Sequence, residues 1–291
     1  MVWRILLLVV GVYAGSTAVI MIKACQVHPM LLAAYRQLIA AAALSPLFLR
    51  DLLRHRGRYG WREVRRTVVP GLMLGAHFIT WIIGARLTWA ANSSLIVNMV
   101  PIVMPFLLYV LIRERLTRGE WAGTAVAMAG VLLLGATDFR VSAAHFAGDA
   151  ICLGSMFLFA IYLALGRRNR DFATIWLYLV PLYTFGGLAC LLLAVTQVRP
   201  GPLTFRDGLL VTGLGVVPTV IGHSVLNHAM KHLRGQLVSL VNLGQFVFAG
   251  VMGFFLLGEL PQVGFYPACV MVVGGAVLAL RSPPRRIESP P

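Results

Sequence analysis

The chain has 291 residues, of which 59% are hydrophobic and 12% are charged, and its formal net charge is +15 at pH 7. Soluble domains contain about 25% charged residues, so a chain with half that share is expected to lie in a lipid bilayer rather than in water. Its basic residues occur in short gaps between long apolar runs, not on one polar face, which argues against a nucleic-acid-binding protein.

Ten apolar runs are long enough to cross a membrane, for which a helix needs about 20 residues. The first follows Arg4 and is interpreted as a retained helix rather than a signal peptide, because further apolar segments follow it directly. The sequence therefore predicts an all-α integral membrane protein with ten transmembrane helices. In chain order, the predicted spans are Trp3–Ile22, Met30–Leu49, Thr67–Ala85, Ser93–Ile112, Glu120–Thr137, Ala147–Leu165, Thr174–Val195, Asp207–Ala229, Gly235–Leu257 and Gly264–Leu280.

The Lys and Arg residues predict the orientation of these spans, because cytoplasmic loops are enriched in both residue types. With the N-terminus inside the cell, nineteen of the 25 lie in cytoplasmic segments and five lie outside, while Arg36 lies within a span. We therefore expect a multi-pass protein of the cytoplasmic (inner) membrane. Both termini, including a tail over residues 281–291, are predicted to be cytoplasmic.

A shift of 145 residues brings parts of the two halves into register and pairs Glu114 with Glu259. This pair carries weight because the chain has only ten acidic residues and each of the two ends an apolar run. Each half contains five predicted spans, so the second half enters the membrane with the opposite orientation. We predict two inverted five-helix repeats, residues 1–137 and 147–280, with a substrate site at their interface.

Short motifs in both halves resemble the EamA family of the drug/metabolite transporter superfamily. The matching stretches are RLTWAANSS (86–94), Pro101, RERLT (113–117), GHSVLN (222–227) and GELP (258–261). The sequence departs from the family pattern at Arg113, where the family has glycine, and at Phe246, which matches Pro101. The resemblance covers essentially the whole chain. It implies an exporter of a small solute. From the two inverted halves we expect alternating access about a central site built by helices one to four and six to nine.

Polar side chains within spans are costly and face a cavity or a partner group, so the few present are the candidate substrate-binding residues. Arg36 lies in the second span, where a guanidinium at the helix centre costs about 2.5–3.5 kcal/mol. It binds a carboxylate or phosphate of the solute, or it is a structural residue that bonds to a broken helix or reaches the membrane surface. His77 and Trp81 share a face of the third span, as His223 and Asn227 do in the eighth. Either histidine carries a proton in an exchange cycle or bonds to a neighbouring helix.

The weaker candidates come from the first, fourth, sixth and ninth spans. They are Tyr13, Asn98, Tyr162, Asn242 and Gln245. Pro101 and Pro105 bend the fourth span and free backbone carbonyls that can bind a ligand. The amide side chains either contact the solute or form hydrogen bonds between helices.

All ten acidic residues lie in loops, in the tail or at span ends, which disfavours a cation carrier that depends on a buried carboxylate. We expect an amino-acid-like solute that is anionic, zwitterionic or neutral and polar. The expected partners are this small-molecule substrate, the lipid bilayer, and protons or an exchanged solute, with no nucleic acid; the oligomeric state stays open.

No catalytic residue, metal or cofactor is expected. The four cysteines show no CxxC spacing, and neither GxSxG nor HExxH occurs. The alternative functions are a channel-like or uncoupled facilitator and an intramembrane enzyme.

Overall fold

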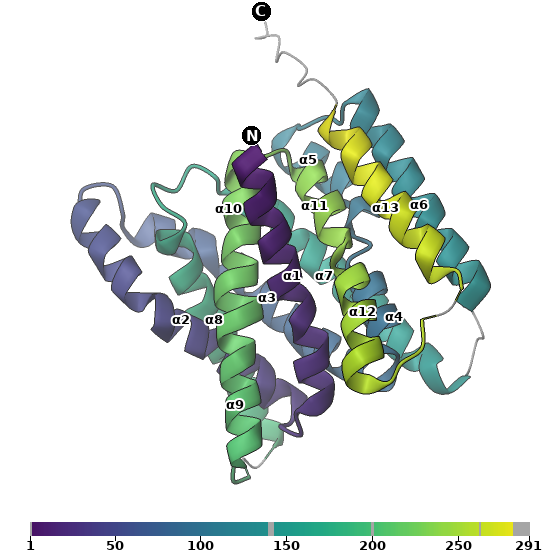
Figure 1. Cartoon of the computed structure of the whole chain (residues 1–291). Coiled ribbons are helices and arrows are strands. Elements are labelled where there is room, and N and C mark those ends of the chain that lie inside the picture. The colour runs from purple at the N-terminus through teal and green to yellow at the C-terminus, as the bar shows by residue number, and fades with distance from the viewer. Residues whose placement is uncertain (1, 139–142, 199–200, 262, 282–291) are drawn as a thin grey trace, which may run out of the picture.

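The computed structural model describes residues 2–138, 143–198, 201–261 and 263–281, and among these it contains helices and no strand. The all-helical prediction is therefore confirmed. The elements are α1 (Val2–Ala24), α2 (Pro29–Arg54), α3 (Trp61–Leu87), α4 (Ala90–Val97), η1 (Val100–Ile102), α5 (Met104–Ile112), α6 (Arg118–Asp138), α7 (Ala143–Arg168), α8 (Trp176–Gln197), α9 (Phe205–Leu214), η2 (Gly215–His223), α10 (Ser224–His232), α11 (Gly235–Leu243), α12 (Gln245–Leu257) and α13 (Phe265–Leu280) (Figure 1).

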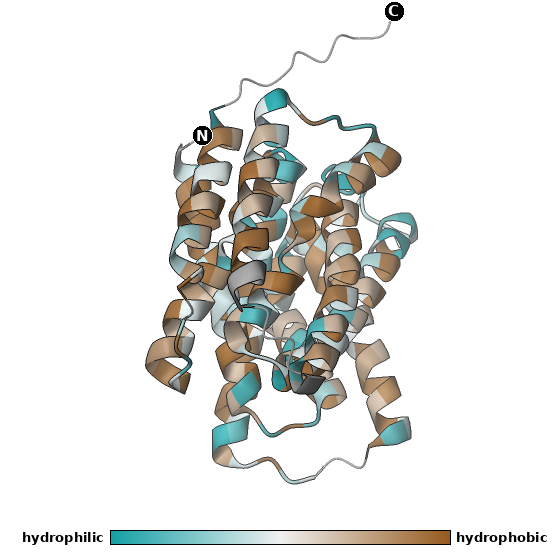
Figure 2. Cartoon of the chain, turned by 90° about the vertical axis from the view of Figure 1, so that its right-hand side faces the viewer, coloured by the Kyte–Doolittle hydropathy of each residue, from teal (hydrophilic) through white to brown (hydrophobic). Residues whose placement is uncertain are grey.

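Seven helices in the described residues are long and apolar enough to cross a membrane, and an eighth span results if one bent helix pair is counted as a unit. A 23-residue helix such as α1 is about 35 Å long, which exceeds a hydrocarbon core of about 30 Å. Hydrophobic residues dominate the helix shafts, and hydrophilic residues gather towards helix ends and connections (Figure 2). Each of the ten predicted spans overlaps helical residues. The count of ten crossings and the inverted repeat stay predictions.

The fourth predicted span is broken at its prolines. Ala90–Ile102 and Met104–Ile112 meet at an angle of 43°. Pro105 has no N–H to donate to the carbonyl of Pro101, four residues earlier. That carbonyl instead accepts a hydrogen bond from Nε2 of Gln236, at 3.1 Å. The carbonyl expected to be available to a ligand is thus engaged by a side chain from the second half of the chain.

The eighth predicted span also changes its winding at a proline. The π-helix η2 contains Pro218 and joins α9 to α10. Pro218 has no N–H for the carbonyl of Leu214, and the hydroxyl of Thr219 donates to that carbonyl at 2.7 Å. Such π-helical turns are rare and occur frequently at functional sites.

Helices from the two halves of the chain pack directly on one another. α1 packs on α9, η2 and α10, α3 packs on α7 and α8, α2 on α8, and α4 on α12. The pair α6 and α13 lies at one edge of the bundle (Figure 1). Close approach requires glycine at two of these contacts. A Cβ at Gly71 would lie 2.5 Å from the carbonyl oxygen of Leu182, and one at Gly123 would clash with the carbonyl of Gly275.

Candidate functional site

A small cavity lies at the centre of the bundle, between elements of both halves. It leaves about 20 Å³ in which the centre of a water molecule can move, which is room for roughly one or two waters. Its lining comprises Gly11, Gly15, Ala18, Arg36, His77, Trp81, Val97, Asn98, Phe159, Pro218, Gly222, His223, Leu226, Asn242 and Gln245. This lining contains a guanidinium and no carboxylate.

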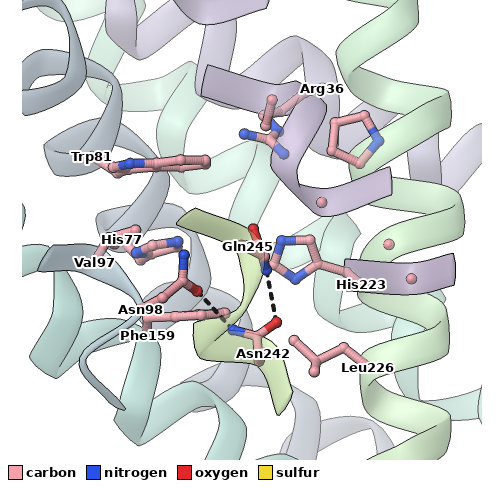
Figure 3. A pocket seen from close by; sticks show the side chains of 15 residues that line it. Arg36, His77, Trp81, Val97, Asn98, Phe159, His223, Leu226, Asn242 and Gln245 are labelled. Carbon is pink, nitrogen blue, oxygen red and sulfur yellow. Dashed lines mark hydrogen bonds between the residues drawn. The ribbon is translucent and has the colours of Figure 1, made fainter. Parts of the chain in front are cut away.

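Among the described residues that line the cavity, Arg36 alone is an arginine, lysine, aspartate or glutamate. The side chain is 0% exposed. Its Nε donates to Oγ1 of Thr219 at 3.1 Å, and its Cζ lies 3.7 Å from the ring centroid of Phe78. Nη1 and Nη2 are buried and have no hydrogen-bond partner among the described residues. Figure 3 shows the guanidinium at one end of the cavity. A buried cation with free donors is a strong site for an anion, because an unpaired charge in this environment is costly.

The orientation of Arg36 depends on the irregular winding of η2. The hydroxyl proton of Thr219 is committed to the carbonyl of Leu214, so its oxygen lone pairs are free to accept from Arg36 Nε. The aromatic face of Phe78 holds the guanidinium by a cation–π contact. Thr219 and Phe78 therefore fix the side chain so that its two terminal nitrogens remain unpaired.

His77 lies in a column of aromatic rings. Its ring is stacked on Trp81 (centroids 5.7 Å apart) and on Phe159 (4.6 Å). The Ser155 hydroxyl donates to the His77 carbonyl at 2.9 Å, while His77 Nδ1 lies 2.8 Å from that hydroxyl and 3.2 Å from the Ser155 carbonyl. Because the carbonyl only accepts, Nδ1 is assigned as the protonated nitrogen. Nε1 of Trp81 donates to Ser93 at 3.0 Å.

Three amide side chains form a chain of hydrogen bonds across the cavity. Nδ2 of Asn242 donates to Oδ1 of Asn98, and Nε2 of Gln245 donates to Oδ1 of Asn242, both at 2.7 Å. Nδ2 of Asn98 donates to the carbonyl of Ser94 at 2.8 Å. The first two bonds are the dashed lines in Figure 3. The same amides therefore line the cavity and link the two halves. The expected hydrogen bonds between helices are present, and contact of these amides with a solute stays a prediction.

His223 lies across the cavity from His77 and Trp81 (Figure 3). Its Nδ1 is 3.4 Å from the hydroxyl of Tyr162. Nδ2 of Asn227 bonds to the Tyr162 hydroxyl and donates to the carbonyl of His223 at 2.8 Å. Tyr162 and Asn227 thus contact His223 on the side away from the cavity and do not line the cavity themselves.

The structure brings together seven of the ten predicted site residues on the cavity wall. They are Arg36, His77, Trp81, Asn98, His223, Asn242 and Gln245. Tyr13 lies elsewhere: it is 52% exposed and packs edge-on against Phe248, 5.5 Å away. Gly11 and Gly15 face the cavity, and a residue two positions from each lies on roughly the opposite side of a helix.

Sequence reasoning missed Phe159 and Thr219. Phe159 is one of several aromatic residues in an apolar span, and nothing in the local sequence singles it out. Thr219 follows Pro218, and a hydroxyl next to a helix-breaking proline was a usable signal. No group of three or more His, Cys, Asp or Glu side chains that could hold a metal ion occurs in the part of the chain that the structure describes.

Comparisons with known proteins agree with this architecture. The model of the EamA-like transporter family matches residues 1–136 and again residues 146–281. A protein of Archaeoglobus fulgidus described as an uncharacterized transporter is 24% identical over 284 residues, which is 94% of this chain and 95% of that protein. A solved crystal structure with 19% sequence identity superposes with a TM-score of 0.74, covering 95% of this chain and 96% of the other. At that identity the superposition supports the fold alone.

Proposed function

The chain belongs to the EamA-like transporter family and is a multi-pass membrane transporter, and from this premise we propose that it carries a small solute with a carboxylate or another anionic group by alternating access. Amino acids and related metabolites are the solute class that fits best. The proposed location is the cytoplasmic membrane, with both ends of the chain in the cytoplasm and export as the direction.

The observation that carries this proposal is the pair of free nitrogens on Arg36. Nε is committed to Thr219, so a carboxylate would engage Nη1 and Nη2 end-on. Two parallel charge-assisted hydrogen bonds of this kind are among the strongest that proteins form. The absence of a carboxylate from the lining works in the same direction, because an organic cation would find no counter-charge there.

The uncharged part of the solute would meet the amide chain and the aromatic column. Asn98, Asn242 and Gln245 offer donors and acceptors to an amine or hydroxyl group, while Trp81 and Phe159 offer apolar faces. His77 and His223 are the proposed sites of proton uptake if transport is coupled to protons. An exchanged solute is the alternative coupling partner.

The size of the cavity supports a mechanism in which the protein must open and close. Space for one or two waters cannot hold an amino acid, so the halves have to separate to admit a solute. The helix contacts support two related halves. Exchanging equivalent helices of the halves turns the pairing of α1 with α9, η2 and α10 into that of α7 with α3. It maps the α2–α8 and α6–α13 pairings onto themselves, and the α4–α12 pairing onto that of α11 with α5.

We place both termini in the cytoplasm because of the distribution of Lys and Arg and because the helix ends next to them lie at the same end of the bundle. α1 begins and α13 ends on the same side of the molecule (Figure 1). Export rests on the family resemblance and is tested by comparing accumulation in cells with uptake into inside-out vesicles.

Counterflow in proteoliposomes tests the function. Vesicles preloaded with one member of a panel of amino acids and short carboxylates are diluted into the labelled solute, with its methyl ester as a competitor. A carrier gives a transient overshoot that depends on the preload, whereas a channel-like path gives none. Loss of a charge-assisted hydrogen bond costs about 1.5–3 kcal/mol, so Arg36→Ala should weaken binding by roughly ten- to a hundredfold.

The matched control is Arg65→Ala, because Arg65 is exposed and outside the cavity lining. It should leave counterflow unchanged. Equal affinity of Arg36→Ala and the parent for every carboxylate, or equal competition by the esters, would remove the anion-carrier proposal.

A further inference from the structure

Glu114 joins the two halves of the chain at one end of the bundle. It follows α5, and its Oε2 lies 2.9 Å from Nε of Arg167, in the last turn of α7. Its Oε1 accepts a hydrogen bond from the backbone N–H of Gly235, the first residue of α11, at 3.1 Å. The carboxylate therefore satisfies a free donor at a helix N-terminus and neutralises a cation at the same time. We call Glu114, Arg167 and Gly235 the N-side clasp.

Glu259 makes the same arrangement at the other end. Its Oε1 lies 2.9 Å from Nζ of Lys23, in the last turn of α1. Its Oε2 accepts from the N–H of Ala90, the first residue of α4, at 2.9 Å. We call Glu259, Lys23 and Ala90 the far-side clasp. Figure 1 shows α11 starting at the end of the bundle where α1 begins, and α4 starting at the opposite end.

The local backbone before each glutamate is the same. Arg113 and Gly258 have left-handed conformations, with φ of 56° and 68°. The N–H of Glu114 then bonds to the carbonyl of Leu108, and that of Glu259 to the carbonyl of Gly253, each six residues back. This helix ending turns both carboxylates towards the opposite half. It gives a physical reason for the glycine before Glu259, whereas the equivalent position before Glu114 is taken by Arg113.

Each clasp connects groups that must separate when the halves part at that end. Every partner of the two glutamates named above lies in the other half of the chain. Opening one end would break an ion pair and remove a helix cap together, while the opposite clasp stays closed. Both clasps are formed here, and the cavity between them is too small for a solute.

We propose that the two clasps are the gates of the transport cycle: the N-side clasp opens to admit or release solute at the N-terminal side, and the far-side clasp does so at the opposite side. This inference rests on the alternating-access function proposed above. Because the clasps are built alike, neutralising one should shift the protein towards the conformation that is open at that end.

Sided labelling of a cysteine in the cavity tests the gates without any solute. Leu226→Cys places the reporter on the cavity wall, where Leu226 is 4% exposed. A membrane-impermeant maleimide is added to intact spheroplasts or to inside-out vesicles, with the same protein lacking the reporter as background. Glu114→Gln should raise labelling from the N-terminal side, and Glu259→Gln should raise labelling from the other side, each by about fivefold or more.

Glu63→Gln is the matched control. Oε2 of Glu63 also accepts from a backbone N–H at a helix start, that of Gly60 at 3.0 Å, but within one half. This variant should label like the parent from both sides. If the glutamate variants fold poorly, Arg167→Gln and Lys23→Gln remove the ion pairs, leave both glutamates on their helix starts, and should show the same sidedness. Each also loses one hydrogen bond to a carbonyl within its own half, that of Met230 for Arg167 and that of Thr88 for Lys23.

Two results would overturn the proposal that the clasps are gates. One is equal labelling of both glutamate variants from both sides; the other is a lower Tm with no change in sidedness, which is the behaviour of static anchors. A parent protein that labels from both sides but shows no counterflow for any solute would instead count against the proposed function. The two failures are therefore distinguishable.

Discussion

Replacing Thr219 with valine tests whether the π-helical segment η2 holds Arg36 in place. Valine keeps the shape of threonine and removes the hydroxyl, which accepts from Arg36 Nε at 3.1 Å and donates to the Leu214 carbonyl at 2.7 Å. Losing a hydrogen bond to a charged group costs about 1.5–3 kcal/mol, and losing a neutral bond between transmembrane groups costs about 0.6–1 kcal/mol. The variant should therefore be less stable by about 2–4 kcal/mol.

Solute affinity should fall as well, by a smaller amount. Without Thr219 the Arg36 guanidinium has to be ordered when the solute binds, which costs about 0.5–1.5 kcal/mol, or roughly a two- to tenfold higher Kd. Thr219→Ser retains the hydroxyl and should restore both properties. Thermal unfolding in detergent gives the stability, and counterflow titrated with a carboxylate solute gives the affinity. Parent-like behaviour of the valine variant, or a serine variant as weak as the valine one, would contradict this account of Arg36.

Two further substitutions test the end of α5 and the bend before it. Arg113→Gly should raise Tm, because a non-glycine residue at a φ of 56° is strained. Once the greater backbone entropy of glycine in the unfolded chain is subtracted, the net gain in stability is about 0.5–1 kcal/mol. A lower Tm would mean that the Arg113 side chain stabilises the protein by more than its backbone strain costs. Gln236→Leu should lower Tm by the equivalent of about 0.6–2 kcal/mol, because the Pro101 carbonyl loses its donor. An unchanged Tm for this variant would show that the freed carbonyl finds another partner.

Much of the cavity lining could be predicted because few polar groups occur within the spans. Burying Arg36 or His77 in a bilayer is costly, so each had to face a cavity or a partner, and both line the same cavity. The same reasoning failed for Tyr13, since a tyrosine is tolerated on an outer face and its side chain is half exposed. Prolines also gave a correct signal: the fourth predicted span bends at Pro101 and Pro105.

The sequence by itself determined the lipid environment and the helical class, because apolar runs of about 20 residues have few stable alternatives to a helix in lipid. Its short motifs determined the family resemblance. It also singled out Glu114 and Glu259 as an equivalent pair. Only the tertiary structure decided which face of each helix points inwards, since both faces of these spans are apolar. Contacts such as Asn98 with Asn242 or Glu259 with Lys23 join residues far apart in the chain. Their geometry is set by the packing of whole helices, and no local pattern of residues specifies it.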